Sequence, residues 1–71
     1  MSNIETKLRL ILIFVQQYYL NKNKKKFDLF CAIENNLQNF SMDYISKLIK
    51  RLDKEVEFIN SKIRKEKVIF T

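Results

Sequence analysis

Hydrophobic residues recur every three or four positions over residues 4–20, which predicts an amphipathic helix in the first third of the chain. Ser2 and Glu5 have the Ser-x-x-Glu spacing of a capping box, in which each side chain accepts a hydrogen bond from the other residue's backbone amide. We therefore expect the helix to begin there. Its broad hydrophobic face, which should form the core, consists of Ile4, Leu8, Ile11, Leu12, Val15, Tyr18 and Tyr19.

A second hydrophobic strip lies on the polar side of the same helix. Leu10, Ile13 and Leu20 stand there among Glu5, Thr6, Arg9, Gln16 and Gln17. One small domain has too little surface to cover both sides of this helix, and exposed apolar strips are typical of interaction sites. Leu10, Ile13 and Leu20 are therefore predicted to be contacts in a homodimer.

Two further helices are expected in the middle of the chain. The polar run NKNKKK at residues 21–26 predicts a loop, and residues 27–37 return to helical spacing. Ser41 is a good N-cap for a third helix, whose apolar side holds Met42, Ile45, Leu48, Ile49 and Leu52.

The C-terminal third of the chain fits two patterns. Residues 56–60 and 68–71 are rich in β-branched and aromatic residues and flank a basic polar run, which predicts a β-hairpin. The preferred fold is therefore mostly α with a C-terminal β-hairpin, in one domain of residues 1–71 with three helices and a wing.

The alternative fold is all-α. Hydrophobic residues continue at steps of four and three past position 56, a heptad-like seam that consists of Ile45, Ile49, Leu52, Val56, Ile59 and Ile63. On this interpretation residues 41–65 form one long helix that pairs with the first helix in a helical hairpin or bundle. Phe58 would then point away from the seam.

Composition narrows the possible chemistry. The chain of 71 residues has 14 Lys and Arg residues against 8 acidic ones, a net charge of +6, and it has no Gly, Pro, His or Trp and a single Cys. It therefore lacks the glycine loops that hold phosphates, the His and Cys ligands of metal sites, and an imidazole to activate a nucleophile. We expect no enzyme activity, no catalytic residues, no metal and no cofactor.

Residue usage also suggests an origin and a location. Lys, Asn, Ile, Phe, Tyr and Met, which have A/T-rich codons, are abundant, as expected for a low-GC bacterium or for a phage or plasmid living in one. The longest apolar run covers only residues 10–15, too short to cross a membrane, and the lone Cys31 suits a reducing compartment. We therefore expect a cytoplasmic protein, whose basic charge favours nucleic acid as a partner.

The segment SMDYISKLIKRLDKE at residues 41–55 resembles the recognition helix of winged helix-turn-helix regulators of the MarR and SarA kind. The positions that match are Ser41, Ile45, Leu48, Leu52, Asp53, Lys54 and Glu55, and the ending KVIFT looks like the second wing strand of that family. The resemblance covers residues 27–71 as a pattern. It implies that the third helix enters the major groove of double-stranded DNA and that the wing contacts the neighbouring backbone.

The resemblance also implies a set of DNA-binding residues, namely Ser41, Asp43, Tyr44, Ser46, Lys47, Lys50, Arg51, Lys62, Arg64, Lys65 and Lys67. The predicted function is sequence-directed binding of double-stranded DNA by a small transcriptional regulator or an excisionase-like architectural factor. The alternative is a non-enzymatic helical adaptor or inhibitor that binds another protein through the heptad-like seam.

Overall fold

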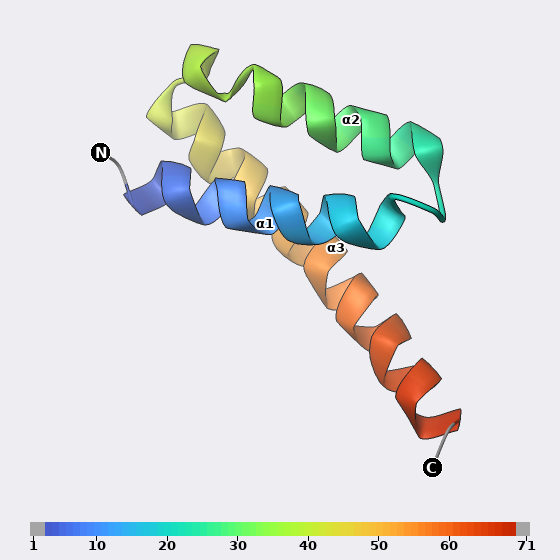
Figure 1. Ribbon diagram of the computed structural model, residues 1–71. Helices are drawn as coiled ribbons and strands as arrows, with labels where there is room; N and C mark the ends of the chain where they lie inside the picture. Colours follow the sequence, from blue (N-terminus) through green and yellow to red (C-terminus); the bar gives the residue numbers. More distant parts are fainter. Residues whose placement is uncertain (1–2, 70–71) are drawn as a thin grey trace.

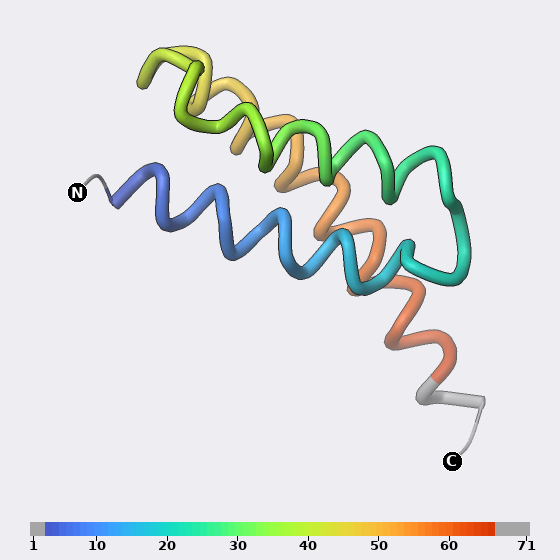
Figure 2. The backbone as a smooth tube through the Cα atoms, turned by 45° about the horizontal axis from the view of Figure 1, so that its top comes forward, coloured from blue at the N-terminus to red at the C-terminus, as the bar shows by residue number. Residues whose placement is uncertain are grey.

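The protein is a three-helix assembly in which the first helix contacts both of the others (Figure 1). The computed structural model describes the backbone of residues 3–69 and the side chains of residues 3–66. Helix α1 spans Asn3–Tyr19, α2 spans Lys24–Asn35, a short 3-10 helix η1 covers Leu37–Asn39, and α3 spans Met42–Ile69. Helices α1 and α2 lie side by side in opposite directions, and α3 crosses α1 and extends beyond it (Figure 2).

The core forms where the hydrophobic faces of the helices meet. Its buried members are Leu8, Leu12, Val15, Tyr19, Phe30, Leu37, Ile45, Leu48, Ile49, Leu52 and Ile59. No polar or charged residue is buried among the described residues. Because burying one such aliphatic or aromatic side chain stabilises a fold by about 1.5–3 kcal/mol, this cluster supplies the main favourable contribution to folding. The predicted core face of the first helix is thereby confirmed.

The turn between α1 and α2 is shorter than the sequence pattern predicted. The chain leaves the helical conformation only over residues 20–23, and three of the lysines assigned to a loop form the first turn of α2. Positive charge is unfavourable at a helix N-terminus. Asn23 compensates as the N-cap, because its side-chain oxygen accepts a hydrogen bond from the amide of Lys26 at 3.1 Å.

The predicted C-terminal β-hairpin is wrong. The described residues 3–69 contain no strand, and the segment assigned to the hairpin continues α3 from Val56 through Ile69. The basic run that was expected to form a wing tip is thus part of a helix. Phe70 and Thr71, the end of the expected second strand, lie outside the described residues, as does Ser2 of the predicted capping box.

The alternative all-α fold is confirmed. Ser41 begins α3 as predicted, since its hydroxyl accepts a hydrogen bond from the amide of Tyr44 at 3.1 Å. The heptad-like seam then packs into the core: Ile59 is fully buried, and Val56 and Ile63 are half-buried against it. The burial of Ile59 in the core stabilises the helical conformation of the residues beyond position 56.

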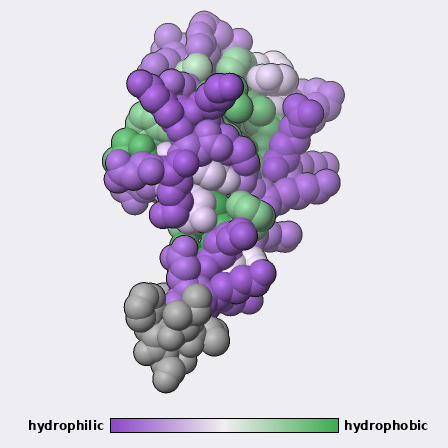
Figure 3. Space-filling view, turned by 90° about the vertical axis from the view of Figure 1, so that its right-hand side faces the viewer, coloured by the Kyte–Doolittle hydropathy of each residue, from purple (hydrophilic) through white to green (hydrophobic). Residues whose placement is uncertain are grey.

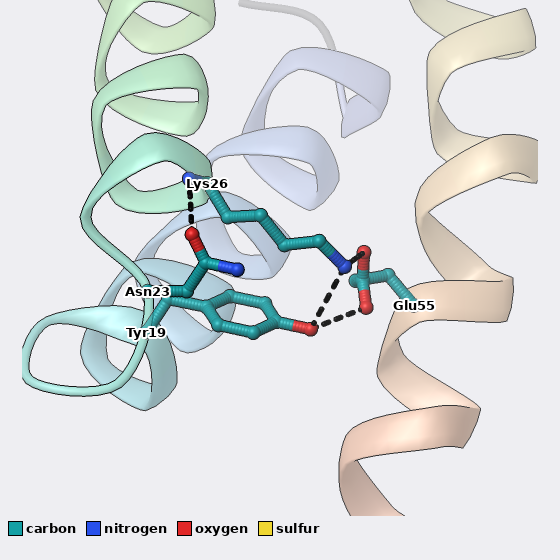
Figure 4. A network of polar contacts seen from close by, with 4 residues as sticks. All are labelled: Tyr19, Asn23, Lys26 and Glu55. Carbon is teal, nitrogen blue, oxygen red and sulfur yellow. Dashed lines mark hydrogen bonds and ion pairs between the residues drawn. The ribbon is translucent and has the colours of Figure 1, made fainter.

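One polar cluster joins all three helices (Figure 4). The Tyr19 hydroxyl on α1 donates a hydrogen bond to Oε2 of Glu55 on α3 at 2.6 Å. Lys26 on α2 pairs with Oε1 of the same carboxylate at 3.2 Å, and its Nζ lies 3.4 Å from the Tyr19 hydroxyl and 4.9 Å from the centre of the ring. The cluster connects α2 to α3. These two helices otherwise contact each other little, because each of them packs mainly against α1.

The cluster predicts a loss of stability in alkaline solution. Burial raises the pKa of Tyr19, and its hydrogen bond to Glu55 raises it further, against the opposing effect of Lys26. Burial lowers the pKa of Lys26, but the hydrogen bonds to Glu55 and Tyr19 and the attraction of the carboxylate outweigh this, so that the net change raises it. The folded state therefore holds both protons more tightly than the unfolded state does, and the stabilisation disappears as the pH rises above about 10.

The measurement is the urea midpoint of unfolding at about pH 8 and about pH 11 for the natural protein and for Glu55→Gln. We expect the midpoint to fall more steeply with pH in the natural protein, because the variant lacks the carboxylate that raises both pKa values. Equal pH dependence in the two proteins would contradict this assignment.

Candidate nucleic-acid interface

The side of α3 that faces away from α1 carries a continuous strip of basic and aromatic residues. We call it the outer strip; it consists of Tyr44, Lys47, Arg51, Lys54, Phe58, Lys62 and Lys65. Successive members lie three or four residues apart, so on a helix with 3.6 residues per turn they share one face, turned away from the buried seam. Every member is exposed.

The outer strip contains five cations and no acidic residue. Glu57 flanks the strip on one side, Glu66 lies one turn after Lys62 on the other side, and Asp53 lies farther round the helix. Glu55 belongs to the cluster with Lys26. Asp43 pairs with Lys47 at 3.3 Å, but both side chains are largely exposed. Because exposed ion pairs are worth about 1 kcal/mol or less, this pair leaves Lys47 available to another anion.

Two members of the outer strip are aromatic. Tyr44 is 47% exposed and packs edge-on against Phe40 with 4.8 Å between ring centres. Phe58 is 49% exposed, and Nζ of Lys62 lies 5.4 Å from its ring centre.

Shallow hollows of about 350 and 330 Å³ lie along the first half of the strip, lined by Tyr44, Lys47, Leu48, Lys50, Arg51 and Lys54. Seen from the α1–α2 turn, the described part of α3 that leaves the body is largely hydrophilic (Figure 3).

The structure brings together five of the predicted DNA-binding residues, namely Tyr44, Lys47, Arg51, Lys62 and Lys65, and Lys50 lies at the edge of the same strip. The helix places others apart. Ser41 is engaged as the N-cap of α3, and Ser46 is half-buried. Arg64 lies on the flank near Glu57, and the side chain of Lys67 lies outside the described residues.

The predicted set of binding residues omits Lys54 and Phe58. A helix that ended near position 55 and a strand from position 56 would not have continued the surface of Lys47 and Arg51 to Phe58. Lys54 lies inside the predicted helix and matched the family pattern, but it was not counted among the binding residues. The steps of three and four that run through position 56 were the available signal, because an unbroken helix carries the basic face onward with the seam.

The predicted dimer contacts lie on the outer side of α1. Leu10, Ile13 and Leu20 are 63%, 44% and 54% exposed, large fractions for apolar side chains. They form a surface separate from the outer strip, since α1 and α3 present these surfaces on the sides turned away from each other.

Other features and all comparisons give no further indication of function. Among the described residues, no group of three or more His, Cys, Asp or Glu side chains is placed to hold a metal ion. None of the helices in residues 3–69 combines the length and apolar character needed to cross a bilayer. Comparison of the chain with protein-family models, curated protein sequences and solved structures finds no match.

Proposed function

We propose that this protein binds double-stranded DNA through the outer strip of α3. The observation that carries the proposal is the alignment of five exposed cations on one helix face, where the ion pair of Lys47 with Asp43 is itself largely exposed. The partner is a polyanion with regularly spaced charges, and duplex DNA carries one negative charge per about 1.7 Å of its axis. The role that fits is a small regulator or architectural factor acting on DNA in the cytoplasm of a low-GC bacterium, phage or plasmid.

The geometry of α3 suits the major groove, which is wide enough to admit an α-helix. From Tyr44 to Lys65 the outer strip runs for about 32 Å at 1.5 Å per residue. A straight helix leaves the curved groove after a few turns, so Lys47, Arg51 and Lys54 contact the phosphates along the edges of the groove while Lys62 and Lys65 reach phosphates farther along. The protruding end of α3 takes the place that the wing held in the sequence-based hypothesis.

The burial of the heptad-like seam favours this function over the adaptor alternative. Ile45, Ile49, Leu52 and Ile59 pack against the rest of the chain and are 7% exposed or less. A partner protein could reach them only after α1 had been displaced. The seam therefore holds the fold together, and the exposed face of α3 offers charge.

The test is fluorescence anisotropy with a duplex of about 24 base pairs, with salt raised from about 50 to about 200 mM. Five phosphate contacts predict a loss of affinity of about 500-fold over this range. Reversing two charges with Arg51→Glu and Lys62→Glu removes two contacts, so we expect binding at about 100 mM salt to weaken by about 60-fold or more.

Lys24→Glu with Lys25→Glu is the matched control, because it changes the net charge equally at exposed positions away from α3. We expect a much smaller loss of affinity in this variant. An equal loss in both variants, or no binding at about 50 mM salt, would reject the outer strip as the interface. Tighter binding to a single strand than to the duplex, with a loss in Phe58→Ala, would instead indicate base stacking on the exposed ring.

A further inference from the structure

The outer side of α1 carries a second regular pattern. Thr6, Leu10, Ile13 and Gln17 are exposed and follow one another at steps of four, three and four, and Leu20 continues the series after the helix ends. This is the spacing with which one helix packs along another. We call these five residues the α1 outer face. It is uncharged, although the chain as a whole carries +6.

A groove adjoins this face. It has a volume of about 250 Å³, lies between α1 and α3, and is lined by Leu10, Ile11, Phe14, Val56 and Asn60. Leu10 belongs to both surfaces, so the apolar area is wider than one helix face. A packed helix would therefore find both a row of side chains and a recess beside it.

The charges of α1 determine which orientation a second copy can adopt. Glu5, Lys7 and Arg9 are the charged residues of the helix, and none occurs from position 10 to position 21. In a parallel pair the two Lys7 side chains and the two Arg9 side chains would lie close together and repel. In an antiparallel pair each basic end lies beside the uncharged end of the other helix.

We propose that two copies of the protein associate by antiparallel packing of their α1 outer faces. A two-fold axis between residues 11 and 12 sets Leu10 of each copy opposite Ile13 of the other, and it matches polar Thr6 with polar Gln17. Lys7 then lies beside Phe14 of the second copy, where a cation can rest on the aromatic ring. A second copy fits better than a charged partner helix, because the face itself offers no charge to recognise.

The proposed dimer leaves the outer strip of α3 free in both copies, since that strip lies on the side of α3 away from α1. Self-association and DNA binding respond oppositely to salt. Salt weakens attraction to phosphates, but it screens the repulsion between two chains of +6 and strengthens their association. The dimer therefore does not rest on the proposed function, and the two proposals can fail separately.

The first experiment measures molar mass by sedimentation equilibrium over a series of protein concentrations. We expect the mass of the natural protein to rise from 8.7 kDa toward twice that value, more readily at high salt. Leu10→Gln with Ile13→Gln removes the central contacts with uncharged, helix-compatible residues, and it should raise the dimer dissociation constant by more than about tenfold.

Leu29→Gln with Met42→Gln is the matched control, because these apolar residues are 55% and 51% exposed elsewhere on the molecule. Far-UV circular dichroism checks that both variants remain helical. A natural protein that stays monomeric at every concentration overturns the proposal. So does association that the control pair abolishes and the Leu10 and Ile13 pair leaves intact.

The second experiment tests the orientation by oxidative cross-linking. In a Cys31→Ser background, chains with Thr6→Cys are mixed with chains with Gln17→Cys. Antiparallel packing predicts a mixed disulfide between the two variants and little cross-linking of either variant alone, because two copies of the same position then lie 11 residues, or about 16 Å, apart along the helices, beyond the reach of a disulfide. Efficient cross-linking of Thr6→Cys alone would show parallel packing and overturn the proposed arrangement.

Discussion

Replacing Glu57 by proline is expected to destabilise the protein by about 3 kcal/mol or more. Glu57 lies inside α3 with its side chain exposed, so the substitution removes little packing. Proline instead removes a backbone hydrogen bond to residue 53 and its ring clashes with that carbonyl group. The helix must kink or end there, and Ile59 then loses its place in the core.

The measurement is urea unfolding followed by far-UV circular dichroism, with Glu57→Ala as the control. Alanine favours the helix and leaves the backbone hydrogen bond in place, so we expect a change of at most about 0.5 kcal/mol. A loss below about 1 kcal/mol for Glu57→Pro would contradict a continuous helix through this position, because proline is tolerated in turns and edge strands.

The second large effect is expected for Ile59→Ala, at about 2–5 kcal/mol. Ile59 is fully buried, and truncation would leave a cavity that rigid helix packing can fill only in part. The adjacent Phe58 is the control: its ring is larger but 49% exposed, and its described contact is with the Lys62 side chain. We expect Phe58→Ala to cost less than about 1 kcal/mol.

The urea midpoint of unfolding is measured for both variants and for the natural protein. A shift of the midpoint reports a change in stability if the dependence of the unfolding free energy on urea concentration stays the same. The order of the two effects is the informative result. A larger loss for Phe58→Ala than for Ile59→Ala would mean that α3 is rotated about its axis relative to the described packing, with the basic outer strip displaced as well.

Local patterns were sufficient where one signal dominated. The hydrophobic stripe of α1 predicted its buried face, including Leu8 and Leu12, and Ser41 marked the start of α3. Both predictions are confirmed, because helical periodicity and capping depend on residues within a few positions of one another.

At residues 56–60 local sequence patterns are not sufficient to predict the conformation. Val56, Phe58 and Ile59 suit a strand by their propensity, whereas the spacing of the seam from Leu52 to Ile63 suits a helix. The sequence alone leaves strand and helix balanced here. The decision comes from the core, in which Ile59 becomes fully buried because the helix continues.

What the sequence determined by itself is therefore the helical first half, the cap at Ser41, the net charge and the lack of the residues that most enzyme and metal sites use. What only the tertiary structure decided is the conformation of residues 56–69, and with it the continuation of the outer strip from Lys54 to Phe58 and beyond. The physical reason is that propensity differences at one position span only about 1 kcal/mol and change with context, whereas burying one isoleucine against a neighbouring helix contributes about 1.5–3 kcal/mol.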